Sequence, residues 1–218
     1  DTLYSYEGTI MTEWQGLTGP GYPKKNYDSD LVDANGNKVD TSLLGMPAEN
    51  DWIFKAEYLD NSLLDNSVTY EFSRRMGQYA PRTRQCEVFL DGTYIGVYTL
   101  TEKVKRDNNR LDIAKMTSAD TSGSELTGGY IIEMNINGDP AAWNSVYPPI
   151  NNATSPHAVE FKYVYPKADS ILPVQGNYIK TFVDSFENAL NGTNYTNDTL
   201  GYRKWIDVGT FIDFLIVN

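Results

Sequence analysis

Apolar residues recur at helical spacing in two stretches of the chain. In residues 62–76 an apolar side chain returns every four positions, and Gly77 follows as a typical helix stop. In residues 174–190 aromatic side chains recur with the same period. The pattern therefore predicts one helix in each stretch, and a third helix is predicted over residues 208–218.

Strand patterns dominate the first hundred residues. The dipeptide Asp91-Gly92 separates two alternating runs, which is the sequence signature of a tight β-hairpin. Asn35-Gly36 carries the same signal and predicts a second hairpin, with residues 26–33 and 38–42 as its two strands.

The second half of the chain begins with a charged connector at residues 101–110. Behind it, residues 128–134 and 158–165 read as two further strands, followed by the second and third helices. The order of elements is hairpin, strand, helix and hairpin, and then strands and helices. This order favours the α+β class.

Composition narrows the function classes. The 218 residues include 18 Lys and Arg against 29 Asp and Glu, so the net charge is −11, and no overall field attracts DNA, RNA or an anionic membrane. The hydrophobic content of 40% is enough for a sizeable core, and no apolar run is long enough for a transmembrane segment. With Cys86 and His157 as single representatives, a disulfide framework and a Cys/His zinc cluster are excluded.

The residues give little support to three catalytic or metal-binding functions. The acidic run at residues 28–37 departs from the spacing of a calcium-binding loop, and a solvated hairpin turn explains it equally well. A Ser/His/Asp hydrolase would have to use His157, and the chain has no Gly-x-Ser-x-Gly elbow. Nothing singles out a pair of glycosidase carboxylates in so acidic a chain.

Residues 16–27 form the one segment with a pattern suited to phosphate. Three glycines precede Lys24 and Lys25, and glycine lets backbone N–H groups approach an anion closely while a lysine supplies charge. An ordinary glycine turn with surface lysines explains the same residues, and both alternatives stay open on the pattern alone. The usual nucleotide motifs are missing from the chain.

Four N-glycosylation acceptors occur, at Asn152, Asn191, Asn194 and Asn197. An Asn- and Thr-rich loop also generates such triplets by chance, so the firmer prediction is a solvated loop at residues 191–199. Together with the scarcity of cysteine, this composition favours an extracytoplasmic bacterial protein, secreted or at the cell surface.

Several segments match one known family in the family's own order: Pro23-Lys-Lys-Asn-Tyr27, Leu43-Leu-Gly-Met-Pro47, Asp51-Trp52, Tyr58-Leu-Asp-Asn-Ser-Leu-Leu-Asp-Asn66, Met76-Gly-Gln-Tyr-Ala-Pro-Arg-Thr-Arg84, Glu87-Val-Phe-Leu-Asp-Gly-Thr-Tyr-Ile-Gly-Val-Tyr98, Thr101-Glu-Lys-Val-Lys-Arg106 and Leu126-Thr-Gly-Gly-Tyr130. Across nearly its whole length the chain resembles the spore coat protein H (CotH) family. The resemblance implies an atypical protein-kinase-like fold with two lobes. Residues 1–105 would be an N-lobe, an antiparallel sheet plus one helix with the hinge, and residues 106–218 a truncated, mixed α/β C-lobe.

The resemblance also implies a nucleotide site made of six residues: Gly16, Lys24, Lys25, Glu71, Thr101 and Glu102. The glycine opens the loop that covers the phosphates, and one of the two lysines contacts them and pairs with the helix glutamate. The last two residues form the hinge against which adenine stacks. ATP and Mg²⁺ or Mn²⁺ are the implied cofactors, and the catalytic and metal-binding aspartates are expected beyond Asn218.

Two hypotheses of function follow. The first is an exported kinase that transfers the γ-phosphoryl group of ATP to Ser or Thr of a secreted or surface protein. The second is a non-catalytic adhesin or protein-binding module with the same fold. The second is favoured by Gln15 and Leu17, where the family usually has Arg and Ser, and by Asp65, where it usually has Arg. A soluble α+β domain of another role is the third reading.

Overall fold

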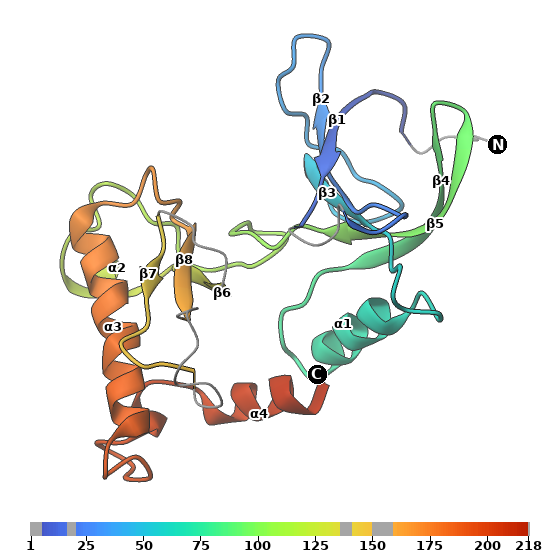
Figure 1. Ribbon diagram of the computed structural model, residues 1–218. Coiled ribbons are helices and arrows are strands. Elements are labelled where there is room, and N and C mark those ends of the chain that lie inside the picture. The colour runs from blue at the N-terminus through green and yellow to red at the C-terminus, as the bar shows by residue number, and fades with distance from the viewer. Residues whose placement is uncertain (1–5, 17–20, 136–140, 150–158, 218) are drawn as a thin grey trace. The chain divides into compact units, whose positions relative to one another are not determined.

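The chain folds into two compact units. The computed structural model describes residues 6–16, 21–135, 141–149 and 159–217 (Figure 1). One unit comprises Asp1–Val104 together with Asp213–Asn218, and the other comprises Lys105–Ile212. Each unit combines helices with an antiparallel sheet, as the α+β class predicts.

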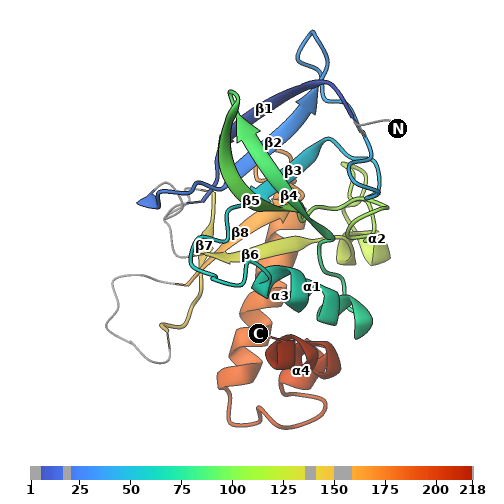
Figure 2. The same cartoon turned by 90° about the vertical axis from the view of Figure 1, so that its right-hand side faces the viewer.

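The first unit contains a five-stranded sheet. Its strands are β1 (Thr9–Trp14), β2 (Tyr27–Val32), β3 (Asp51–Lys55), β4 (Thr83–Leu90) and β5 (Thr93–Glu102). Their order across the sheet is β1-β2-β3-β5-β4, and every neighbouring pair is antiparallel. Figure 2 shows the long β4–β5 hairpin, in green, beside the other strands. Helix α1 (Asp65–Arg75) connects β3 to β4.

The core of this unit forms around β3. Trp52 is fully buried and packs with Leu31, Met46 and Leu100. Its indole N–H donates to the carbonyl oxygen of Glu49 at 3.1 Å, so the one polar atom of the ring has a partner. Successive strand residues point to opposite faces of the sheet, and Asp51, Trp52 and Ile53 are all buried, so both faces of β3 are covered at its start.

Of the two predicted hairpins, the one at Asp91-Gly92 forms and the one at Asn35-Gly36 forms only its turn. Asp91 and Gly92 have φ angles of 49° and 76°, as the two-residue turn between β4 and β5 requires. The turn at Gly36 also forms, but beyond it only an isolated bridge joins Lys38 to Val32. The predicted strand at residues 38–42 is therefore wrong. In this turn the Asp33 carboxylate accepts the backbone N–H groups of the residues that follow, which lowers its pKa.

Helix α1 lies inside the predicted range of residues 62–76. Asp60 prepares its start, because its carboxylate accepts the backbone N–H of Asp65 at 2.9 Å and the N–H and hydroxyl of Ser62 at 2.7 Å each. Gly77, with φ of 84°, ends it. The predicted apolar repeat is present, yet the four residues that make it are 36% to 58% exposed: Leu64, Val68, Phe72 and Met76.

The second unit contains a three-stranded sheet of order β6-β8-β7. Its elements are α2 (Gly123–Thr127), β6 (Ile131–Asn135), β7 (Trp143–Asn144), β8 (Glu160–Tyr165), α3 (Pro173–Asn191) and the 3₁₀ helix η2 (Tyr202–Lys204). Helix α4 (Val208–Val217) begins in this unit, and its residues from Asp213 belong to the first. Gln175 anchors α3, since its amide donates to the carbonyls of Thr117 and Asp120.

The segment after α3 matches the solvated loop expected from its composition. Residues 191–200 are all exposed, and the Asn197 side chain accepts three hydrogen bonds from Thr199 and Leu200. The fourth glycosylation acceptor, Asn152, lies outside the described residues. Within the described part of the chain, no helix has the length and apolar content to cross a membrane.

The β4–β5 turn yields a stability prediction. Gly92→Ala forces a side chain into the left-handed region, and we expect the free energy of unfolding to fall by about 1 kcal/mol. Gly21→Ala is the matched control, because its φ is outside that region and the added methyl group meets no atom within 4 Å. Urea unfolding followed by tryptophan fluorescence measures both, and equal losses for the two variants would contradict the turn assignment.

The start of α1 yields a pH prediction. The N–H of Asp65 and the hydroxyl of Ser62 lower the pKa of Asp60 to about 2 from its usual value of 3.8. A lowered pKa means that the ionised group stabilises the fold above its unfolded-state value and ceases to do so as pH falls toward 2. The difference in unfolding free energy between wild type and Asp60→Ala should therefore be constant above pH 5 and shrink below pH 4. A difference independent of pH would refute this role.

Candidate functional site

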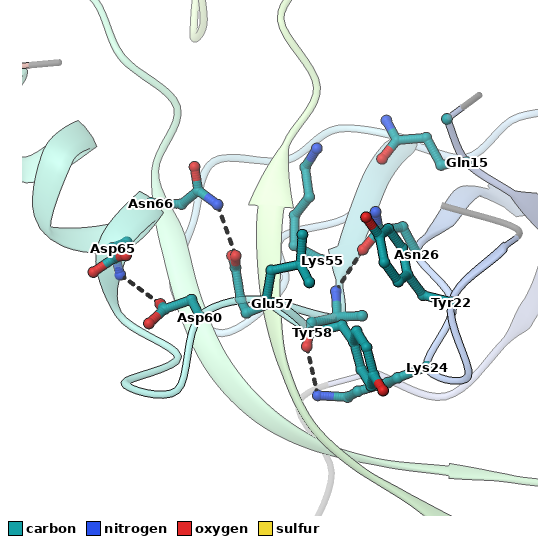
Figure 3. A pocket seen from close by; sticks show the side chains of 13 residues that line it. Gln15, Tyr22, Lys24, Asn26, Lys55, Glu57, Tyr58, Asp60, Asp65 and Asn66 are labelled. Carbon is teal, nitrogen blue, oxygen red and sulfur yellow. Dashed lines mark hydrogen bonds between the residues drawn. The ribbon is translucent and has the colours of Figure 1, made fainter. Parts of the chain in front are cut away.

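The first unit contains a cavity of about 560 Å³ at the end of β3 (Figure 3). Three segments line it: the described part of the β1–β2 connection, residues 55–60, and residues 65 and 66 at the start of α1. Gly16 lines the cavity with a φ angle of 87°, so the connection bends there in a conformation that favours glycine. The predicted phosphate-covering loop therefore borders the cavity at Gly16, and residues 17–20 lie outside the described part.

Lys24 lines the cavity and also ties three segments together. Its ammonium donates to the carbonyl of Ala56 at 2.6 Å and to the carbonyl of Val97, and it lies 4.4 Å from the centre of the Tyr98 ring. Gly96 lies beside this side chain, and its φ of 113° is in the region that favours glycine. Burial lowers the pKa of the Lys24 ammonium, and the charge of Glu57 raises it.

The side chain of Lys25 lies in a different environment from that of Lys24. Its ammonium donates to the carbonyl of Tyr22 and lies 5.4 Å from the centre of the Trp14 ring, and it does not line the cavity. Both lysines precede β2, which begins at Tyr27. They belong to the connection between β1 and β2.

Lys55 is the cavity cation that sequence reasoning missed. It is the last residue of β3, and its side chain lines the cavity. Among the described residues, no hydrogen bond or ion pair engages its ammonium. The segment Trp52-Ile-Phe-Lys55 is an apolar strand that ends in a lysine, and this pattern could have identified Lys55. The glycine-rich segment before Lys24 and Lys25 favoured those two lysines instead.

The opposite side of the cavity is acidic. Figure 3 shows Glu57, Asp60, Asp65 and Asn66 gathered there, away from Lys24. The Asn66 amide donates to Oε2 of Glu57 at 2.7 Å. The cavity lining therefore combines carboxylates with ammonium groups, and the carboxylates lie away from the Lys24 ammonium.

Glu71 does not reach the cavity. Its carboxylate binds Arg75 at 2.8 Å and Arg74 at 2.7 Å, one turn further along α1, and these two guanidinium groups lower its pKa. The predicted pairing of Glu71 with Lys24 or Lys25 is absent from this structure. Neighbours three and four residues apart on one helix form ion pairs readily, which explains the difference.

Thr101 and Glu102 are interior residues of β5. Both are at most 2% exposed, and neither lines the cavity. The Glu102 carboxylate binds the Arg82 guanidinium at 2.7 Å and the Arg82 backbone N–H at 2.8 Å. Their side chains hold the end of β5 in the sheet, and the structure does not bring them to the other predicted site residues.

The described part of the cavity lining contains two ammonium groups, of Lys24 and Lys55, and three carboxylates. Across the described ranges, no three His, Cys, Asp or Glu side chains are grouped closely enough to hold a metal ion. The acidic turn at Asp33 is included in this result, so the calcium reading gains no support. A ligand that places an anionic group near the lysines and hydrogen-bond donors near the carboxylates matches the polarity of the cavity.

The sequence of this chain matches the model of a known protein family. The model of the family described as "CotH kinase protein" matches residues 16–218. Comparison with curated proteins gives no significant match. Because the family match covers most of both units and every residue of the cavity lining except Gln15, the chain belongs to the CotH kinase family.

Proposed function

We propose that this protein binds ATP in the cavity of the first unit and transfers the γ-phosphoryl group to Ser or Thr of a secreted or surface protein. The observation that carries the proposal is Lys55, a lysine without a partner among the described residues, at the end of the third strand of the sheet. In protein kinases the phosphate-contacting lysine lies on the third strand, and a glycine-rich loop covers the phosphates. Gly16 and Lys55 are the residues that we propose for those two roles in this chain.

The cavity has the size and polarity that a nucleotide needs. Its volume of about 560 Å³ lies within the range of about 300–1,000 Å³ that is usual for small-molecule sites. Lys55 and Lys24 supply positive charge for the phosphates, and Glu57 and Asp60 are acceptors for hydroxyl or amine donors. This division of charge orients a ligand that has one strongly anionic end.

The residues of this chain contribute binding and orientation. Lys55 neutralises charge on the phosphates, and backbone N–H groups near Gly16 approach them closely. A divalent cation bound to the phosphates would supply further charge neutralisation. The described residues hold no cluster of three metal ligands, so no step is assigned to a protein-bound metal. In this proposal residues 1–105 are the N-lobe and residues 106–218 part of the C-lobe, and the protein acts outside the cytoplasm.

A second candidate function is a non-catalytic binding module. It is favoured by Gln15 and Asp65, which both line the cavity and replace residues that are usually Arg in the family. Each replacement removes a cation, and Asp65 adds a carboxylate, so phosphate is held less strongly. The two candidates differ in one measurable property, which is affinity for ATP.

The lysines give a direct test. We expect Lys55→Met to weaken ATP binding about 10- to 100-fold, because a charge-assisted hydrogen bond contributes about 1.5–3 kcal/mol. Its thermal stability should not change, since its ammonium has no partner among the described residues. Lys24→Met should lower both affinity and stability, because the carbonyls of Ala56 and Val97 lose their donor.

Isothermal titration calorimetry with ATP and Mg²⁺ or Mn²⁺ measures the affinity, and differential scanning calorimetry measures the stability. Lys38→Met is the matched control, because Lys38 is exposed, pairs with Asp30 and does not line the cavity. Binding by wild type that Lys55→Met leaves unchanged would place the nucleotide elsewhere. Absence of binding by wild type, with no phosphotransfer to protein, would support the binding module.

A further inference from the structure

Asn26 joins the two segments that are proposed to contact phosphate. It directly precedes β2 and lines the cavity. Its backbone carbonyl accepts the N–H of Gln15 at 2.9 Å, which extends the β1–β2 pairing by one residue. Its side-chain oxygen accepts the N–H of Ala56 at 2.7 Å, and Figure 3 draws this bond as a dashed line. One residue therefore ties the β1–β2 connection to the end of β3.

Both of these bonds act next to a residue of the proposed phosphate site. Gln15 directly precedes Gly16, and Ala56 directly follows Lys55, the last residue of β3. A peptide unit is planar, so the N–H of Ala56 and the carbonyl of Lys55 move as one rigid group. The Asn26 side chain thus fixes the peptide unit that Lys55 begins, and its backbone fixes the chain just before Gly16.

The Ala56 N–H depends on this side chain for its partner. The pairing of β3 with β2 and with β5 stops before Ala56, so the strand ladders supply no acceptor there. Ala56 is only 2% exposed, and a buried backbone N–H without a partner is costly. The carbonyl of the same residue accepts the Lys24 ammonium, so residues 24 and 26 hold Ala56 from both of its backbone groups.

The Lys55 side chain has no polar contact that could position it instead. Among the described residues, no hydrogen bond or ion pair engages its ammonium. The direction in which this side chain leaves β3 is therefore set by its backbone. A binding group keeps its geometry only when the residues behind it are themselves held by packing and hydrogen bonds.

We infer that Asn26 is a positioning residue that holds Lys55, and the β1–β2 connection next to Gly16, in place for a nucleotide phosphate. The inference rests on the proposed nucleotide site. The Asn26 amide is neutral and its oxygen serves the Ala56 N–H, so its contribution comes from geometry and not from charge. Loss of this side chain should reduce phosphate affinity through Lys55.

The test is a double-mutant cycle with ATP affinity, measured by isothermal titration calorimetry with Mg²⁺, as the readout. Asn26→Ala removes the acceptor of the Ala56 N–H, and we expect ATP binding to weaken about tenfold. In a Lys55→Met background the same change should weaken binding by less than about twofold, because the ammonium that Asn26 positions is gone. Asn50→Ala is the matched control: Asn50 binds Asp40 away from the cavity lining, so ATP affinity should not change.

Asn26→Asp keeps an oxygen acceptor for the Ala56 N–H and adds a negative charge, so it tests the same role in a variant that retains the bond. Differential scanning calorimetry should show wild-type thermal stability for Asn26→Asp and a lower unfolding temperature for Asn26→Ala. Asn26→Asp should lose ATP affinity through repulsion of the phosphates. Its loss relative to wild type should shrink as salt is raised from about 0.05 to about 0.5 M, and the loss for Asn26→Ala should not.

The outcomes separate this inference from the proposed function. If wild type does not bind ATP, both fail. If wild type binds ATP and Lys55→Met weakens the binding, while Asn26→Ala binds as wild type does, only the role of Asn26 is overturned. An equal loss for Asn26→Ala in both backgrounds would overturn it as well, because Asn26 would then act independently of Lys55. A salt-independent loss for Asn26→Asp as large as that for Asn26→Ala would do the same, because the acceptor oxygen would then have no part in the effect.

Discussion

One partly buried ammonium group organises the candidate site. Lys24 crosses from the β1–β2 connection to the carbonyls of Ala56 and Val97, at the end of β3 and within β5. An ammonium is strongly hydrated, so its burial is tolerated only because two carbonyls and the face of the Tyr98 ring replace water. The same bonds fix the backbone of Ala56, and this determines the direction in which the chain leaves the sheet toward Glu57.

The partners of the acidic side chains decide which of them face the cavity. In a chain with net charge −11, carboxylates are abundant, and their positions depend on the donors nearest to them. Glu71 finds Arg74 and Arg75 on its own helix, where little conformational entropy is lost in pairing. Among the described residues Glu57 has the Asn66 amide as its hydrogen-bond partner, and its other carboxylate oxygen is buried without one. Local competition for donors thus shapes a site that residue type alone does not identify.

Apolar periodicity predicted α1 without predicting what covers it. The repeat from Leu64 to Met76 forms one face of the helix, as expected, and this face stays partly exposed among the described residues. The apolar residues of α4 behave in the same way, with Phe214 58% and Ile216 70% exposed. Periodicity reports how side chains are distributed around a helix axis, and the covering partner is a separate, non-local property.

The sequence by itself determined the local elements: the hairpin at Asp91-Gly92, α1 with its stop at Gly77, and the fold class and family. These follow from backbone preferences and from motifs that are contiguous in the chain. Only the tertiary structure decided that Lys55 lines the cavity, that Glu71 does not, and that Glu57 binds the Asn66 amide at the cavity wall. Those relations join residues from separate strands and a helix. They depend on which hydrogen-bond donors and acceptors come together when the sheet forms, and no local sequence pattern contains that information.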